Sequence, residues 1–340
     1  MLDKSIIVFT KIFDPTADVV ILQLQKEKKE PIRLNTEEIP LDSSFDFNLD
    51  TLKWEGNINI NTSKRSINVN EVRSIWWRRP SHLQFPVNFS ENEKRFAKSE
   101  MFSVLGGFWR ILDCYWMSFP TSIRNAEYKI EQLQRASQMG FEVPRTLVTM
   151  KPDRVREFAA CLEDQMIFKV FSDPFLCQTF DKHENGLQET SFQPLVTKTT
   201  LITEKELAQL HPEKLIPPCL FQEYIPKRVE LRVTVIGDEV FVAEIDSQAR
   251  EETRIDWRDY SVDITYRKAT LPLEIEERCL KFVRSYNLNY SAIDLILTPD
   301  GRYVFLENNP NGQFVFVQQA VPELHMVEAL CACLIRGANS

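Results

Sequence analysis

The sequence predicts an α/β protein built from more than one domain. Short apolar runs that are typical of buried strands alternate with longer amphipathic segments that are typical of helices. A chain of 340 residues is also long enough for two or three domains with their own cores. With 43% apolar and 26% charged residues, the composition is that of an ordinary soluble globular protein.

The first 120 residues are interpreted as one α/β unit. Residues 5–10 form an apolar run that predicts a strand. The helix expected over 14–30 has Pro15 near its first turn, where proline is tolerated. Further strands are expected at residues 31–35, 45–50, 52–60, 65–69 and 72–77.

A long helix is expected over residues 90–113. Ser90 is a suitable N-cap, and Glu93 follows three residues later, which is the spacing of a capping box. This helix completes the first unit, which closes near Pro120.

The rest of the chain is expected to form two further units, residues 121–215 and 216–340. Helices are expected at residues 121–140, 151–164, 203–210, 272–286 and 322–336. Strands are expected at residues 145–150, 166–171, 219–225, 230–237, 239–248, 292–297 and 303–308. Residues 172–200 are polar, contain Gly186 and two prolines, and show no clear period, so we expect a mobile loop there.

Charge and cysteine usage exclude several classes of function. A net charge of −8 and a pI of about 5.3 give no electrostatic support for nonspecific binding of nucleic acid or of anionic membranes. No stretch approaches a transmembrane span, and the N-terminus lacks the apolar core of a signal peptide. The seven cysteines show neither CxxC pairs nor zinc spacing, so we expect reduced thiols in a cytoplasmic protein.

Two strands near the C-terminus predict a metal site. The run at 292–297 carries Asp294, and a strand that starts at 303 ends in Glu307, Asn308 and Asn309. The turn "TPDG" between the runs predicts a hairpin that places Asp294 beside Glu307 and Asn309. Positions 307 and 309 share a face because strand side chains alternate. Oxygen ligands of this kind suit Mg²⁺, which binds through one or two carboxylates together with substrate phosphates.

A lysine in an upstream strand indicates where such phosphates would bind. Lys169 lies in the apolar run "IFKV", where an ammonium group needs a partner such as a phosphate. A second strand and its polar connection follow at 219–229, and the predicted metal hairpin comes last. This order resembles the ATP-grasp superfamily over residues 121–320, with an α/β domain in front.

A narrower resemblance is carried by "SIWWRRP" (74–80), by residues 222–248 and by "DWR" (256–258). Together they resemble the ATP-grasp peptide macrocyclases of graspetide (microviridin-type) biosynthesis. The resemblance implies an enzyme that links Asp or Glu side chains of a ribosomal precursor peptide to Ser, Thr or Lys side chains. One departure is the missing glycine-rich phosphate loop, since Gly186 is the single glycine between 171 and 200.

The resemblance also implies roles for individual residues. The residues implied for ATP are Lys129 and Lys169 as phosphate-contacting lysines, Gln222, Glu223, Tyr224 and Ile225 as an adenine-binding hinge, and Glu230 as the ribose contact. Arg232 and Arg258 are implied to face the phosphates and the acyl-phosphate intermediate. Asp294, Glu307 and Asn309 are implied to bind Mg²⁺. The resemblance assigns no role to Asp246, Ser247 or Gln248.

Ordinary structural roles are alternatives at these positions. Glu230 and Arg232 alternate on one strand face and also suit a cross-strand salt bridge. Arg78 and Arg79 either end a strand and stack on the preceding tryptophans or contact acidic groups of a peptide.

The implied reaction is the ATP-dependent activation of a carboxylate as an acyl phosphate, which a hydroxyl or amine of the same peptide then attacks. The general base is left open among Glu230, Asp246 and Asp256. By analogy, the leader of the precursor docks within 172–220, and the oligomeric state is left open between a monomer and a homodimer. One alternative to a macrocyclase is an ATP-grasp ligase that adds amino acids to a protein tail. Another is a nucleotide-binding peptide partner without catalysis.

Overall fold

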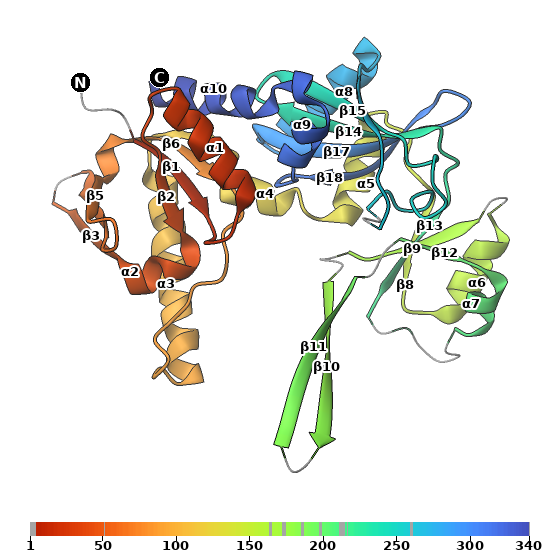
Figure 1. The fold of residues 1–340 in the computed structure, drawn as a ribbon, viewed down its shortest axis with the longest axis horizontal. Coiled ribbons are helices and arrows are strands. Elements are labelled where there is room, and N and C mark those ends of the chain that lie inside the picture. The colour runs from red at the N-terminus through yellow and green to blue at the C-terminus, as the bar shows by residue number, and fades with distance from the viewer. Residues whose placement is uncertain are drawn as a thin grey trace.

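A computed structural model of the chain describes residues 5–50, 52–162, 165–171, 175–184, 187–196, 199–210, 215, 217–258 and 261–339. Its strands form five sheets, and the last helix returns to the first sheet, so that the N-terminal and C-terminal segments lie side by side (Figure 1). Within the described residues, no helix has both the length and the apolar character needed to cross a membrane.

The N-terminal unit is built on a parallel sheet whose strand order is β2-β1-β6-β7. Its strands are β1 Ser5–Thr10, β2 Ile32–Asn35, β6 Val72–Trp77 and β7 Tyr115–Met117. The helices in this unit are α1 Pro15–Lys26, η1 Thr36–Glu38, α2 Ile39–Asp42, η2 Val69–Glu71 and α3 Glu91–Ile111. Ser90 and Glu93 form the predicted capping box at the start of α3.

A smaller antiparallel sheet packs beside the parallel one. It contains β3 Ser43–Leu49, β4 Trp54–Ile60 and β5 Arg65–Asn68, in that order. Phe47 of β3 stacks on Phe108 of α3 with 4.1 Å between ring centroids. The long helix therefore closes the hydrophobic core of this unit, as its apolar face predicts.

The central unit is an antiparallel sheet in the order β12-β9-β13-β8. Its elements are β8 Thr146–Thr149, α6 Pro152–Ala160, β9 Met166–Lys169, β12 Thr200–Ile202, α7 Glu204–Ala208 and β13 Cys219–Glu223. Its small core contains Val155, Met166 and Phe221.

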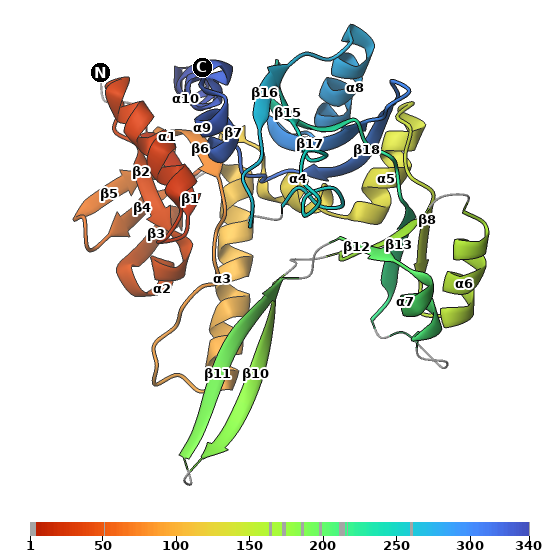
Figure 2. The same ribbon diagram turned by 45° about the vertical axis from the view of Figure 1, so that its right-hand side comes forward.

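The prediction of a loop without strands over 172–200 was wrong, whereas the expected mobility stays a prediction. Strands β10 Phe175–Glu184 and β11 Leu187–Val196 form an antiparallel hairpin that extends away from the rest of the molecule (Figure 2). Glu184 pairs with Leu187, so the connection has two residues, Asn185 and Gly186. Asn-Gly is the dipeptide preferred in such turns, and this signal marks the hairpin in the sequence. Both turn residues lie outside the described residues.

The C-terminal unit is an antiparallel sheet in the order β16-β15-β14-β17-β18. Its strands are β14 Val229–Ile236, β15 Glu239–Ile245, β16 Tyr266–Ala269, β17 Tyr290–Leu297 and β18 Tyr303–Asn309. Its helices are α4 Pro120–Asn125, α5 Lys129–Gln138, α8 Leu273–Arg284, α9 Val315–Ala320, η3 Pro322–Leu324 and α10 Met326–Asn339. The side chains of α4, α5 and α8 share a hydrophobic cluster with one face of the sheet, which leaves the other face of β14 and β17 for polar residues.

The helix expected over 121–140 is interrupted. Helix α4 ends at Asn125, and α5 begins at Lys129. Gln132 Nε2 donates a hydrogen bond to the Ala126 carbonyl oxygen at 2.6 Å. This break makes Lys129 the first residue of its helix. The last expected helix begins at Met326 rather than 322, after His325 in the left-handed region at φ 52°.

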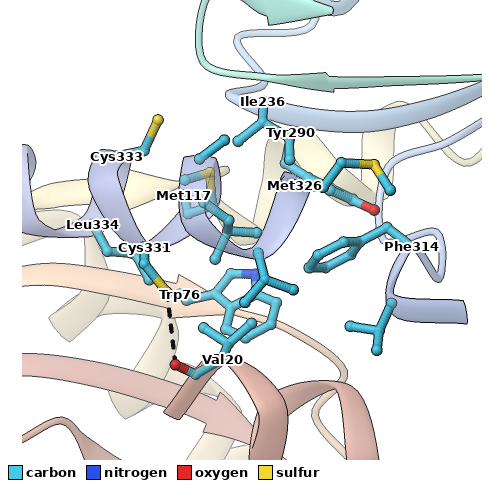
Figure 3. Close-up of a cluster of buried hydrophobic side chains, with 14 of the residues drawn as sticks. Val20, Trp76, Met117, Ile236, Tyr290, Phe314, Met326, Cys331, Cys333 and Leu334 are labelled. Carbon is cyan, nitrogen blue, oxygen red and sulfur yellow. Dashed lines mark hydrogen bonds between the residues drawn. The ribbon is translucent and has the colours of Figure 1, made fainter. Parts of the chain in front are cut away.

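One hydrophobic cluster joins the N-terminal and C-terminal units (Figure 3). Val20 of α1 and Trp76 of β6 lie in it together with Tyr290 of β17 and Leu334 of α10. Because apolar burial is the main favourable term in folding, this shared cluster fixes the two units relative to each other.

Two helical glycines make a matched test of this packing. A Cβ at Gly337 of α10 would lie 2.3 Å from Cγ of Tyr115, whereas a Cβ at Gly107 of α3 would have nothing within 4 Å. We expect Gly337→Ala to lower the free energy of unfolding by about 1–3 kcal/mol through overpacking. Gly107→Ala should raise it by about 0.5–1 kcal/mol, because alanine favours the helix. Urea unfolding of both variants measures the change in the free energy of unfolding. Equal changes in the two variants would contradict the close contact between α10 and β7.

Candidate active site

The predicted hairpin places its three oxygen-bearing side chains together. Asp294 lies directly opposite Glu307, and Asn309 lies opposite Ala292. Asn309 Nδ2 donates to Asp294 Oδ2 at 3.0 Å and to Glu307 Oε1 at 3.4 Å. The side chains at 307 and 309 therefore share a face, as strand alternation predicts. Their role as metal ligands stays a prediction.

A bulge in β18 sets this arrangement. Toward the turn, Leu295 lies opposite Phe305. Continued without interruption, this ladder would place Leu306 opposite Asp294 and turn Glu307 to the other face. The register shift between Asp294 and Leu295 makes Leu306 the extra residue. As a result, Leu306 and Glu307 both line the same cleft.

Arg232 holds Asp294 from the neighbouring strand. The two residues are cross-strand partners in β14 and β17, and they are 5% and 9% exposed. Arg232 Nη1 donates to both carboxylate oxygens, at 2.8 and 2.9 Å, and Nη2 donates to the Gln313 carbonyl at 3.1 Å. Burial raises the pKa of Asp294, and Arg232 opposes this shift. The cross-strand salt bridge that we considered thus exists, but it joins Arg232 to Asp294 and not to Glu230.

Two lysines approach Glu307 from the other side of the cleft. Lys129 Nζ lies 3.1 Å from Glu307 Oε2 and donates to the Val170 carbonyl at 2.9 Å. Burial works to raise the pKa of Glu307, but Lys129, Arg258 and Lys169 together lower it below its usual value. Glu307 is therefore an ionised carboxylate in a cationic setting.

Lys169 is the cation of this group that lacks an anionic partner. Burial lowers its pKa to about 8, Glu307 opposes that shift, and Lys129, Lys227 and Arg258 reinforce it. Within the described part of the chain, Lys169 forms neither a hydrogen bond nor an ion pair, in contrast to Lys129. An ammonium group that is shielded from water and forms no direct ion pair among the described residues favours binding of an anion.

These groups line an open cleft between the central and C-terminal units. Its apolar wall contains Pro144, Ile167, Ile225, Ile296 and Leu306. The predicted site residues along it are Lys129, Lys169, Gln222, Glu223, Tyr224, Ile225, Glu230, Arg258, Asp294 and Glu307. Apolar side chains and charged groups both line the cleft, which is typical of a site for a small-molecule ligand.

Two ion pairs in the cleft were not predicted. Lys227 Nζ donates to Glu230 Oε1 at 2.7 Å and to the Ile255 carbonyl at 3.0 Å. Arg258 donates to both carboxylate oxygens of Asp256, each at 2.8 Å. The spacing of Lys227 and Glu230, three residues apart, is the signal that could have revealed the first pair.

The pairing of Asp256 bears on the choice of a general base. Besides the two Arg258 bonds, Asp256 Oδ2 accepts from the Thr199 backbone at 3.0 Å. Burial works to raise the pKa of Asp256, but these bonds lower it well below its usual range. Asp246 does not line the cleft and pairs with Arg267. Because Glu230 is paired with Lys227, each of the three base candidates is already bound to a cation.

Arg78 has a structural role, so the alternative in which it contacts acidic groups of a peptide is wrong. It is 1% exposed, and its Nη1 donates to the carbonyls of Asn311 at 2.7 Å and Gly312 at 3.2 Å. Its Nη2 donates to Gln313 Oε1, and the guanidinium lies 5.9 Å from the Trp76 ring centroid. Arg78 is therefore too buried to reach a peptide. Arg79 is exposed and donates to the Asn311 carbonyl at 3.2 Å.

The donor set at the hairpin fits magnesium. No cluster of three or more His, Cys, Asp or Glu side chains suited to a metal occurs among the described residues. Two carboxylates and one amide are too few for a closed protein site, but Mg²⁺ keeps waters and takes phosphate oxygens as further ligands. Asp294, Glu307 and Asn309 are the residues that would hold such an ion.

Removing Arg232 tests the buried pair. We expect Arg232→Met to lower the free energy of unfolding by about 3–5 kcal/mol, because it leaves a buried carboxylate unpaired. The pKa of Asp294 is already raised by burial and should rise further without Arg232. A carboxyl with a higher pKa in the folded than in the unfolded protein loses stability as pH rises, so the loss should be larger at pH 8 than at pH 5.

Urea unfolding at the two pH values measures this effect. Arg302→Met is the matched control, because Arg302 forms its ion pair with Glu142 at the surface and should change stability by about 1 kcal/mol or less. Equal losses for the two variants would contradict the importance of the buried pair.

Comparisons with known proteins agree with this geometry. Residues 6–124 match the family model of the MvdD pre-ATP-grasp domain. No curated protein matches the chain in sequence. Several solved structures match over nearly the whole chain, and they include the following three enzymes in complex with precursors or peptides.

The first is a RiPP-associated ATP-grasp ligase from Chryseobacterium gregarium, in complex with ADP and a leader and core peptide. It has 26% identity and a TM-score of 0.81, with 98% of this chain and 97% of that chain covered. The second is macrocyclase MdnC from Microcystis aeruginosa MRC, bound with precursor peptide MdnA. It has 28% identity and a TM-score of 0.81, with 98% and 99% covered.

The third is the ATP-grasp ligase PsnB, complexed with a phosphomimetic variant of its minimal precursor, Mg and ADP. It has 20% identity and a TM-score of 0.70, with 99% of each chain covered, and at this identity the likeness shows the fold alone. The predicted fold is confirmed: the chain has an ATP-grasp fold behind a pre-ATP-grasp domain, and it resembles the ATP-grasp peptide macrocyclases.

Proposed function

We propose that the protein is an ATP- and Mg²⁺-dependent ligase that closes rings in a ribosomal precursor peptide. It activates Asp or Glu side chains as acyl phosphates and joins them to Ser or Thr side chains as esters, or to Lys side chains as amides. The observation that carries this proposal is the oxygen set of Asp294, Glu307 and Asn309, which lies beside Lys129 at a cleft that also has an apolar wall.

The two ends of the cleft suit the two ends of ATP. The flat adenine ring fits the apolar wall near Ile225 and Leu306, beside the hinge that begins at Gln222. Lys129 and Lys169 lie at the end where the phosphates would be. Lys169 is the cation without an anionic partner among the described residues, so a phosphate would supply the missing counter-charge.

In the first step, a carboxylate oxygen of the peptide attacks the γ-phosphorus of ATP, and ADP leaves. Lys129, Lys169 and Arg258 stabilise the charge that develops on the transferring oxygens. When bound, Mg²⁺ supplies further neutralisation of the phosphate charge. Arg232 acts indirectly, because its hydrogen bonds hold Asp294 in place.

In the second step, a hydroxyl or amine of the same peptide attacks the acyl carbon, and inorganic phosphate leaves. The sum of the two steps removes one water from the peptide for each bond. Both reacting groups belong to one bound chain, so proximity supplies much of the rate. Among the cleft carboxylates, Glu230, Asp256, Asp294 and Glu307 are paired with cations, which favours a nucleophile that loses its proton to the departing phosphate or to solvent.

We also propose a precursor peptide as the partner of this protein, because two similar enzymes bind such peptides. The C. gregarium ligase binds a leader and core peptide, and MdnC binds the precursor peptide MdnA. We place the leader contact of this chain within residues 172–220, a range that contains the β10–β11 hairpin and helix α7. An acidic core segment would meet the cationic end of the cleft.

Glu307→Gln tests the proposal at its centre. The substitution keeps the shape of the side chain, but it removes the charge that would face Mg²⁺ and that pairs with Lys129. With ATP, Mg²⁺ and an acidic precursor peptide that contains Ser, Thr or Lys, we expect ADP formation and peptide dehydration to fall about 100-fold or more. Mass spectrometry of the peptide and an ADP assay give the two rates.

Glu142→Gln is the matched control, since Glu142 is a surface carboxylate paired with Arg302. A wild-type rate for Glu307→Gln would overturn the site. For the unmodified enzyme, loss of one water per bond supports ring closure, and its return in mild base identifies an ester rather than an amide. A gain of whole amino acids would instead identify a tail ligase, and nucleotide binding without any product would identify a non-catalytic partner.

A further inference from the structure

We propose that a pocket between helices α1 and α9 binds an aromatic or large aliphatic side chain of the precursor peptide. This side chain belongs to a residue within about four positions of the carboxylate that is activated, so the pocket helps to select which Asp or Glu reacts. The inference rests on the proposed function, because the occupant of the pocket is the substrate of the ligase.

The pocket lies where the N-terminal unit meets the C-terminal unit. Helix α1 contributes Val19 to its lining, and the C-terminal unit contributes residues 262–264 together with Phe316 of α9. Val19 and Phe316 also pack against the hydrophobic cluster that joins the two units. The lining is therefore held by the core of the protein, so the pocket is formed before a ligand binds.

Three aromatic side chains line the pocket and contact one another. Trp257 stacks on Phe316, with 5.9 Å between ring centroids and 20° between ring planes. Tyr266 meets both rings edge-on, at centroid distances of 6.4 Å from Trp257 and 6.1 Å from Phe316. Each ring is held in place by the other two. A surface that is rigid in this way loses little conformational entropy when an apolar side chain binds to it.

The lining favours an uncharged, apolar ligand. Asp263 is the only charged residue among the described residues that line the pocket, so a phosphate or a carboxylate would meet no cation in this lining. Val262 and Ile264 are partly exposed, which leaves apolar surface uncovered in the pocket. Exposed apolar surface of this kind commonly marks a binding site.

Trp257 connects the pocket to the nucleotide cleft, because it lines both. Its chain neighbours, Asp256 and Arg258, form an ion pair in the cleft. Gln313 makes a second connection, since it lines the pocket and its carbonyl accepts from Arg232 at 3.1 Å. A peptide whose carboxylate reacts beside Arg258 therefore has its neighbouring residues beside the pocket. This continuity points to the peptide as the occupant, rather than to a separate small molecule.

Peptide variants test the inference with the full chain, ATP and Mg²⁺. The probe is the acidic precursor peptide that the wild-type enzyme dehydrates. Each aromatic or large aliphatic residue within about four positions of the modified carboxylate is changed to alanine in turn. We expect at least one change to lower kcat/KM about 10–100-fold, mainly by raising KM, because the peptide then buries one apolar side chain less.

An enzyme variant shows whether this pocket causes the preference. Ile264→Asp places a charge in the pocket, so the original peptide and its sensitive alanine variant should then differ by about twofold or less. ATP binding, measured by calorimetry, should stay unchanged, because Ile264 lies in the lining of the pocket and not in the described lining of the cleft. Leu52→Asp is the matched control, since Leu52 is 99% exposed in the N-terminal unit, and it should keep the preference.

The possible failures can be told apart. If the wild-type enzyme dehydrates the peptide and no alanine change alters kcat/KM by more than about twofold, the inference is overturned and the proposed function stands. The same conclusion follows if Ile264→Asp keeps the preference. It also follows if Ile264→Asp changes only the oligomeric state in sedimentation, which would make the pocket an interface between copies of the chain. If the wild-type enzyme dehydrates no precursor peptide, the proposed function is overturned, and this inference with it.

Discussion

The buried ion pair between Arg232 and Asp294 is the interaction on which the arrangement of the site depends. Neither charge could remain buried without the other, because an unpaired charge in a protein interior is strongly unfavourable. Arg232 also donates to the Gln313 carbonyl, and the Gln313 side chain accepts from Thr16 and Arg78 of the N-terminal unit. A continuous polar network thus connects the pre-ATP-grasp domain to a proposed metal ligand.

Apolar and polar contacts stabilise the packing of the N-terminal unit against the C-terminal unit in different ways. The cluster around Trp76 and Tyr290 joins their cores and contributes stability that depends little on exact geometry. The hydrogen bonds of Arg78 and Gln313 are directional, so they set the position of the segment after β18. An ATP-grasp site needs both, because its ligands and the domain in front of them come from opposite ends of the chain.

Sequence patterns predicted most of the fold but not the details that position the site. Alternation alone predicted that Glu307 and Asn309 share a face, whereas their place opposite Asp294 depends on the bulge at Leu306, which leaves no mark in the apolar pattern. The hairpin at 175–196 was missed because it lacks apolar alternation, although Asn-Gly marked its turn. At the break before Lys129, the Gln132 side chain donates to the Ala126 carbonyl, a local side-chain contact that helical periodicity does not encode.

The charge balance of the cleft explains how an acidic protein can hold a triphosphate. Glu307, Glu230 and Asp256 are each bound to a cation in the cleft, and Asp294 is held by Arg232 behind it. These pairs keep the cations in place before any ligand arrives, so that little reorganisation is needed when the phosphates bind. Lys169 differs, since it forms no ion pair among the described residues and burial lowers its pKa to about 8. In the part of the chain that the structure describes, the site is thus preorganised by paired charges, and the ligand would supply an anion to Lys169.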